Sequence, residues 1–112
     1  MTFIAEDNRR IHSRHAARIT GRLTHESDSV DGTIENVGEG GVFFSTTNLE
    51  LAADDGAAVT VSFGCKRRGA PETIERTGTV LRAERYFDGT GVVRAFAVKF
   101  DELLSLDGVE LA

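Results

Sequence analysis

Residues 30–45 read VDGTIENVGEGGVFFS, and this stretch indicates the fold class. In its first half, small or apolar side chains alternate with polar ones, which is the period of a β-strand. The glycine-rich break GEGG follows at residues 38–41, and the apolar run VFFS at residues 42–45 is typical of a short buried strand. The segment therefore predicts two β-strands joined by a turn.

The same alternation extends outward from this hairpin, and glycine-rich or acidic turns separate the segments. Further strands are predicted at residues 17–23, 58–63, 72–86 and 92–100. Closing such a sheet removes its exposed edges, so we predict a mainly all-β fold, a six-stranded antiparallel β-barrel. The leucine-rich tail from Asp101 predicts a short C-terminal helix.

The length of 112 residues suits one domain with a single modest core. No apolar run approaches the roughly 18 residues that a membrane span needs, and the N-terminus has no hydrophobic signal core. We therefore expect a cytoplasmic protein that does not enter a membrane. The single cysteine, Cys65, excludes an intrachain disulfide, and its loop-like surroundings make a catalytic role a poor expectation.

Charge is distributed unevenly along the chain. Residues 1–25 carry a formal charge of +3, because five arginines outweigh two acids, whereas the remaining residues carry −8. Arginine outnumbers lysine 11 to 2, and its planar fork can pair two phosphate or guanine acceptors at once. A cationic arm on an anionic body indicates a negatively charged ligand, although terminal charges are also commonly just solvated.

Two short motifs lie in the right order to form one site. The first is Arg10-x-x-x-Arg14, and the second is Asn36-x-Gly38-x-x-Gly41 at the end of a predicted strand. Arginines can chelate phosphates and stack on purines, and asparagine offers both a donor and an acceptor to a base edge. Glycines let the backbone approach a ligand closely. The pair suits a guanine nucleotide with phosphates, but it has no phosphate loop for hydrolysis.

These two motifs, in this order and strand context, resemble those of the PilZ domain family, whose second motif is Asp/Asn-x-Ser-x-x-Gly. The resemblance implies a barrel that binds cyclic di-GMP in bacterial second-messenger signalling, in processes such as motility or biofilm control. By motif position, Arg10 and Arg14 would contact the phosphates and guanines, with Arg9 assisting. Asn36, together with the glycine motif that ends at Gly41, would form the barrel side of the pocket.

The resemblance also implies a division of labour along the chain. Residues 1–15 would be a flexible arm that becomes ordered on the ligand, and residues 16–112 would be the barrel domain with its helical tail. The output would be a change of shape relayed to an effector protein, and not a reaction. We expect no cofactor, no metal and no enzyme activity, since no nucleophile–base pair or metal set is visible.

Gly38 departs from the family pattern, because serine stands at that position in the motif. Losing one ligand hydrogen bond costs about 0.5–1.5 kcal/mol, or roughly threefold to tenfold in affinity. The leading hypothesis is a cyclic di-GMP receptor with weakened binding. The alternative is a degenerate PilZ-type adaptor that no longer binds the nucleotide. A nucleic-acid-binding barrel is disfavoured, since such domains are usually basic and this chain has a net charge of −5.

Overall fold

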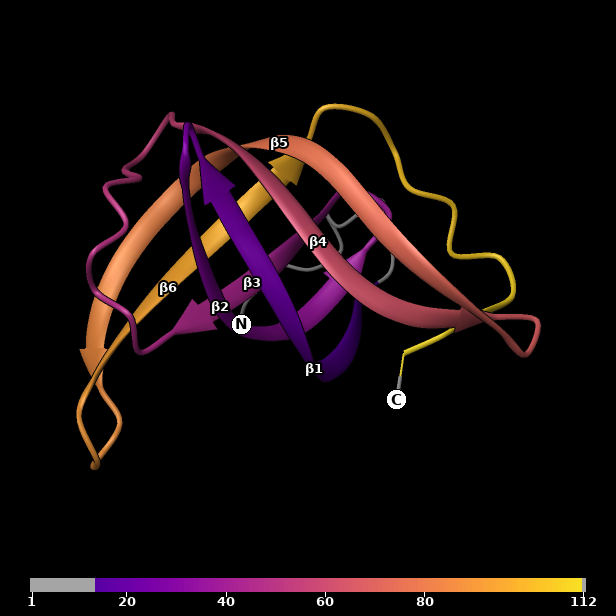
Figure 1. Cartoon of the computed structure of the whole chain (residues 1–112), viewed down its shortest axis with the longest axis horizontal. Coiled ribbons are helices and arrows are strands. Elements are labelled where there is room, and N and C mark those ends of the chain that lie inside the picture. The colour runs from indigo at the N-terminus through magenta and orange to yellow at the C-terminus, as the bar shows by residue number, and fades with distance from the viewer. Residues whose placement is uncertain (1–13, 112) are drawn as a thin grey trace, which may run out of the picture.

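The computed structural model describes residues 14–111, and all of their regular structure is β-strand (Figure 1). The strands are β1 (Arg14–His25), β2 (Asp28–Gly38), β3 (Gly41–Thr46), β4 (Ala58–Arg67), β5 (Ala70–Phe87), β6 (Val92–Phe100) and β7 (Val109–Glu110). The predicted all-β class is confirmed, and each predicted strand lies within or overlaps an observed one. Among these residues no helix could cross a membrane.

One antiparallel sheet contains every strand, in the order β1-β2-β3-β6-β5-β4-β7. An additional pairing joins β1 to β4, with Gly21 opposite Phe63 and Thr24 opposite Thr60. The long strands β4 and β5 curve around the shorter ones in Figure 1. Because the two ends of the six-strand order are joined, most backbone groups of these strands have a neighbour on both sides.

The core lies on the inner face of this curved sheet. Ile34, Phe44 and Phe96 are completely buried there, and the rings of Phe44 and Phe96 have centroids 6.4 Å apart. Burying each such side chain stabilises the fold by about 1.5–3 kcal/mol. Since side chains alternate along a strand, the neighbours of these core residues face outward. Glu35 and Ser45 are such outward residues.

The C-terminal helix predicted from residue 101 onward is wrong. The segment after β6 is extended and ends in the two-residue strand β7, which pairs with the end of β4. Of its leucines, Leu104 is buried while Leu103 is 63% exposed. The Leu104 N–H donates to the Glu39 carbonyl at 2.8 Å, and Gly108 has a φ of 75°, so the backbone finds partners outside a helix. A short helix is only marginally stable without packing. The extended segment with these contacts is therefore favoured over a helix.

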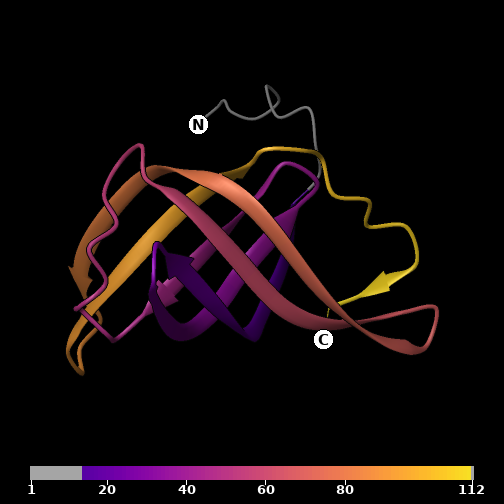
Figure 2. The ribbon, with the colours of Figure 1, turned by 45° about the horizontal axis from the view of Figure 1, so that its top comes forward.

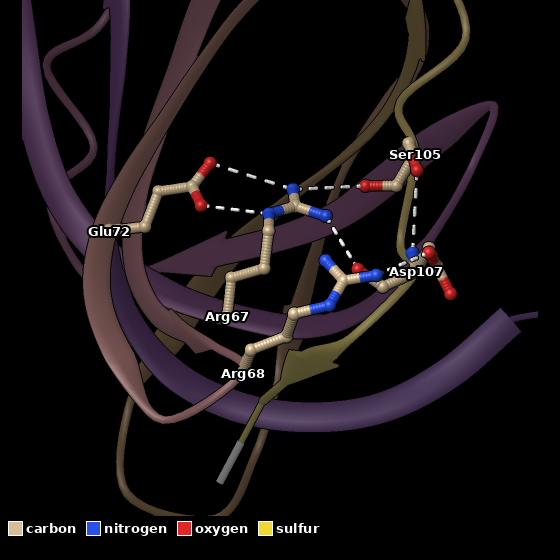
Figure 3. Close-up of polar contacts among 5 residues, drawn as sticks. All are labelled: Arg67, Arg68, Glu72, Ser105 and Asp107. Atoms are coloured by element: carbon tan, nitrogen blue, oxygen red, sulfur yellow. Dashed lines mark hydrogen bonds and ion pairs between the residues drawn. The ribbon is translucent and has the colours of Figure 1, made fainter.

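Arg67, on the β4–β5 hairpin, holds the C-terminal segment in place (Figure 3). Its guanidinium donates to the Glu72 carboxylate at 2.8 Å and to the carbonyls of Asp107 at 2.7 Å and Ser105 at 3.2 Å. Arg68 adds a 2.8 Å contact to the Asp107 carboxylate. Figure 2 shows the segment running from β6 to the tip of this hairpin. The basic tip of this hairpin therefore binds the chain's own C-terminal segment.

Candidate ligand-binding site

The second motif occupies the β2–β3 turn. Asn36 and Gly38 lie in the last part of β2, Gly41 begins β3, and Gly38 pairs with Gly41 across a two-residue connection. The Gly40 carbonyl accepts the Phe100 N–H at 2.8 Å. Together with the Leu104–Glu39 bond described above, this contact fixes both residues of the turn to the chain that follows β6. The turn is therefore a firmly held platform.

Gly41 is required by packing alone. A Cβ at this position would lie 2.0 Å from the carbonyl oxygen of Val98, a contact that the β3–β6 backbones could not accommodate without separating. Its place in the motif therefore has a sufficient explanation in the fold. Its residue type alone says nothing of a ligand.

Strand pairing brings the first motif to the second. In the β1–β2 register, the Cα of Arg14 is opposite that of Gly38, and Ala16 is opposite Asn36. Paired Cα atoms of antiparallel strands lie about 4.5–5.5 Å apart. The backbone positions of two motifs separated by some 22 residues in sequence thus meet at one end of the sheet. Arg9 and Arg10 lie outside the described residues.

Two strand irregularities coincide beside this platform. On β1, Ala17 and Arg18 together oppose the single residue Glu35 of β2, and Arg18 has a left-handed φ of 71°. On the other side of β2, Glu35 is again the extra residue relative to β3. Such bulges turn side chains into directions that a regular strand does not allow, and they are common next to functional sites.

The bulges place Arg18 and Glu35 side by side on the outer face. Nη1 of Arg18 is 3.9 Å from Oε1 of Glu35, while Ser45 Oγ donates to the other carboxylate oxygen at 2.7 Å. The Arg18 side chain is 79% exposed, against 28% for Glu35. Ser45 therefore fixes the carboxylate, and the guanidinium keeps most of its donors open to solvent. Sequence reasoning missed both residues, because period-two alternation carries no signal for a bulge.

A cavity of about 260 Å³ opens on this outer face. Arg18, Glu35 and Ser45 line it, and Tyr86 and Asp88 line it from β5 and the turn after it. N–H donation from the Thr90 backbone holds the pKa of Asp88 below its usual value, so this carboxylate is ionised at neutral pH. The cavity is consequently rich in hydrogen-bond acceptors, and among residues 14–111 Arg18 is its one cationic lining residue.

Arg94 has a structural explanation. It shares a side of β6 with the apolar residues Phe96 and Val98, and it is only 7% exposed. Its guanidinium donates to the carbonyls of Leu51 and Ala53 and lies 4.8 Å from the centre of the Phe96 ring. Arg94 therefore fastens the β3–β4 loop to the sheet.

Cys65 is not an activated nucleophile. Burial raises the pKa of its thiol, with the nearby Glu72 carboxylate contributing in the same direction, so the thiol is protonated at neutral pH. Among residues 14–111, no group of three or more histidine, cysteine, aspartate or glutamate side chains could hold a metal ion.

These features define an all-β domain in which the end of an arginine motif lies against a glycine-rich turn. The PilZ domain family model matches residues 8–111, and the chain therefore belongs to the PilZ domain family. No curated protein matches the sequence.

Two solved structures share the fold. The Bacillus subtilis inhibitor of motility (MotI/DgrA) superposes with a TM-score of 0.70 at 16% identity, over 88% of this chain and 45% of that one. The PilZ domain of YcgR from Escherichia coli, solved with c-di-GMP, gives 0.64 at 12% identity, over 84% and 79% of the two chains. The chain thus spans less than half the length of the motility inhibitor.

Proposed function

We propose that this chain is a cyclic di-GMP receptor without enzyme activity. The observation that carries the proposal is the β1–β2 register, in which the Cα of Arg14 is opposite that of Gly38. Membership of the PilZ family supports it, as does the solved YcgR domain, which holds this nucleotide. In this proposal the phosphates and guanines lie on the β2–β3 turn and are bound by Arg9, Arg10 and Arg14.

The proposed output is a change of shape in a small cytoplasmic barrel. The six joined strands would form the barrel, and residues 1–15 would form an arm that the ligand orders against the turn. A ligand shifts such an equilibrium only by its difference in affinity for the two states. The ordered arm would then present a new surface to an effector protein, with neither a membrane nor a nucleic acid as the partner.

Isothermal titration with cyclic di-GMP tests the proposal. We expect saturable binding by the wild-type chain and loss of most of the signal in Arg14→Ala, since charge-assisted contacts are the strongest available. Arg82→Ala is the matched control. It removes the same charge from β5, where Arg82 pairs with the Glu84 carboxylate, and should leave the affinity unchanged. Absence of heat at hundred-micromolar protein would refute receptor function.

Gly38 favours a second candidate, a protein adaptor that no longer binds the nucleotide. A residue without a side chain cannot supply the hydroxyl that the family motif has at this position. This candidate predicts no titration signal, together with a partner that is recovered equally by the wild type and by Arg14→Ala. Recovery of that partner only when cyclic di-GMP is present would exclude it.

A further inference from the structure

The outer-face cavity beside the candidate site has a composition that does not suit a phosphate. Asp31, Glu35 and Asp88 contribute carboxylates to its lining, and Arg22 pairs with Asp31 at 2.9 Å. A phosphate entering this cavity would be repelled by the negatively charged carboxylates. Hydrogen bonds in the cavity would not compensate for that repulsion. A neutral group that both donates and accepts hydrogen bonds fits better.

Guanine is such a group. Its O6 and N7 atoms accept hydrogen bonds, a pattern that the arginine fork matches, and its N1–H and N2–H₂ groups donate. Arg18 and Glu35 present these complementary functions within 3.9 Å of each other. Because Ser45 donates to only one carboxylate oxygen, the Glu35 oxygen that faces Arg18 can accept from a base.

Tyr86 adds a stacking surface to the same cavity. It lies on β5, lines the same cavity as Arg18 and Glu35, and is 43% exposed. Bases stack readily on exposed aromatic rings, and each such contact is worth about 1–3 kcal/mol. An exposed tyrosine ring in the lining of the same cavity is therefore consistent with a base site.

The backbone of Arg18 supports a functional role independently. A φ of 71° is the left-handed region, which glycine adopts freely and arginine adopts at a cost. The ion pair with Glu35 does not compensate for this cost, since exposed ion pairs contribute little to the free energy of unfolding. Folding alone would be served better by glycine at this position.

We propose, resting on the receptor function above, that Arg18 and Glu35 form a guanine-reading pair that extends the cyclic di-GMP site along the outer face of β1 and β2. Arg18 donates to O6 and N7 of one base, and Glu35 accepts from N1–H and N2–H₂. The arginines of the first motif then bind the phosphates and the other base. Asn36, directly after Glu35 in β2, joins the two parts of the site.

Arg18→Gly separates this role from a structural one. We expect the affinity for cyclic di-GMP to fall about tenfold or more, because a hydrogen-bonding charged group is lost. The thermal unfolding midpoint should stay equal or rise, because glycine relieves the left-handed backbone. Arg82→Ala, which removes the same charge at a residue that does not line the cavity, should change neither quantity.

Glu35→Gln tests the reading of the base. Cyclic di-AMP lacks the N1–H and N2–H₂ donors, so the wild type should prefer cyclic di-GMP strongly, and the variant should lose about tenfold of that preference. Wild-type binding together with unchanged affinity in Arg18→Gly would overturn this inference while leaving the receptor function intact. Absence of binding by the wild type would overturn both.

Discussion

Arg18 and Arg67 each face a glutamate on a neighbouring strand, but the two guanidinium groups are held differently. Arg67, whose side chain is 23% exposed, donates to the Glu72 carboxylate and to two backbone carbonyls of the C-terminal segment (Figure 3). Arg18 is 79% exposed, and within the described part of the chain its one ion pair is the 3.9 Å contact with Glu35. The donors of Arg67 are used by the protein itself, whereas most donors of Arg18 face solvent.

The difference indicates which arginines of this arginine-rich chain have donors available to a ligand. A guanidinium that donates to backbone carbonyls contributes to folding, as Arg67 does at the hairpin and Arg94 does in the interior. A guanidinium held at a strained backbone position with open donors contributes little to folding. In our proposal the outer face of β1 and β2 binds the ligand, whereas the β4–β5 hairpin holds the C-terminal segment in place.

The largest effect is expected from the glycine that supports the binding face. In Gly41→Ala the new methyl group would collide with the Val98 carbonyl, so we expect a loss of about 3 kcal/mol or more in unfolding free energy. Gly64→Ala is the control on β4, since nothing lies within 4 Å of its Cβ position. Urea titration of both variants makes the measurement. Equal stabilities would show that β3 and β6 can separate at no cost.

Arg94→Met tests a buried guanidinium that donates to backbone carbonyls. The variant keeps an apolar side chain against Phe96 but leaves the Leu51 and Ala53 carbonyls without their donor, so we expect a loss of about 3 kcal/mol. Urea unfolding measures the change, and cyclic di-GMP titration should report unchanged affinity. A variant as stable as the wild type would mean that the free-energy cost of burying this charge cancels the stabilisation from its hydrogen bonds.

A smaller effect is expected from Arg67→Ala. The C-terminal segment loses its two carbonyl contacts with Arg67, at Ser105 and Asp107, but keeps its β7 pairing with β4, so we expect the unfolding temperature to fall by about 5 °C. Hydrogen exchange should rise first at the amide of Val109, which donates within the segment. Protection that persists there would show that the segment is held by β7 alone, which would weaken the contrast with Arg18.

Much of the fold could be predicted from residues 30–45 and the alternating segments around them. Period-two patterning fixes which side chains enter the core, and that is why strands such as β2 and β6 match the prediction. The C-terminal segment could not be predicted in this way. Its structure depends on Arg67 and on the Glu39 carbonyl, both far from it in sequence.

The candidate site likewise has one part that could be predicted from the sequence and one part that could not. The order and spacing of the two motifs predict that they form one site, and in the β1–β2 register the Cα of Arg14 is opposite that of Gly38. Arg18 and Glu35 could not be found, because in an ideal strand they would be unremarkable members of the polar face. Only the bulges, which depend on pairing with two neighbours at once, bring them together.

The smallest effect concerns pH, and it sharpens the contrast by isolating the Arg67–Glu72 pair. Hydrogen bonding from Arg67 holds the pKa of Glu72 below its usual value of 4.5. A depressed pKa contributes stability that is fully present above the usual value and is lost as pH falls through the depressed one. The stability difference between wild type and Glu72→Gln should therefore be constant at neutral pH and shrink only below about pH 4.5. Thermal unfolding across pH 3 to 7 measures it, with Glu35→Gln for comparison. A gap that is unchanged at pH 3 would mean that Glu72 acts through packing, and not through its charge on Arg67.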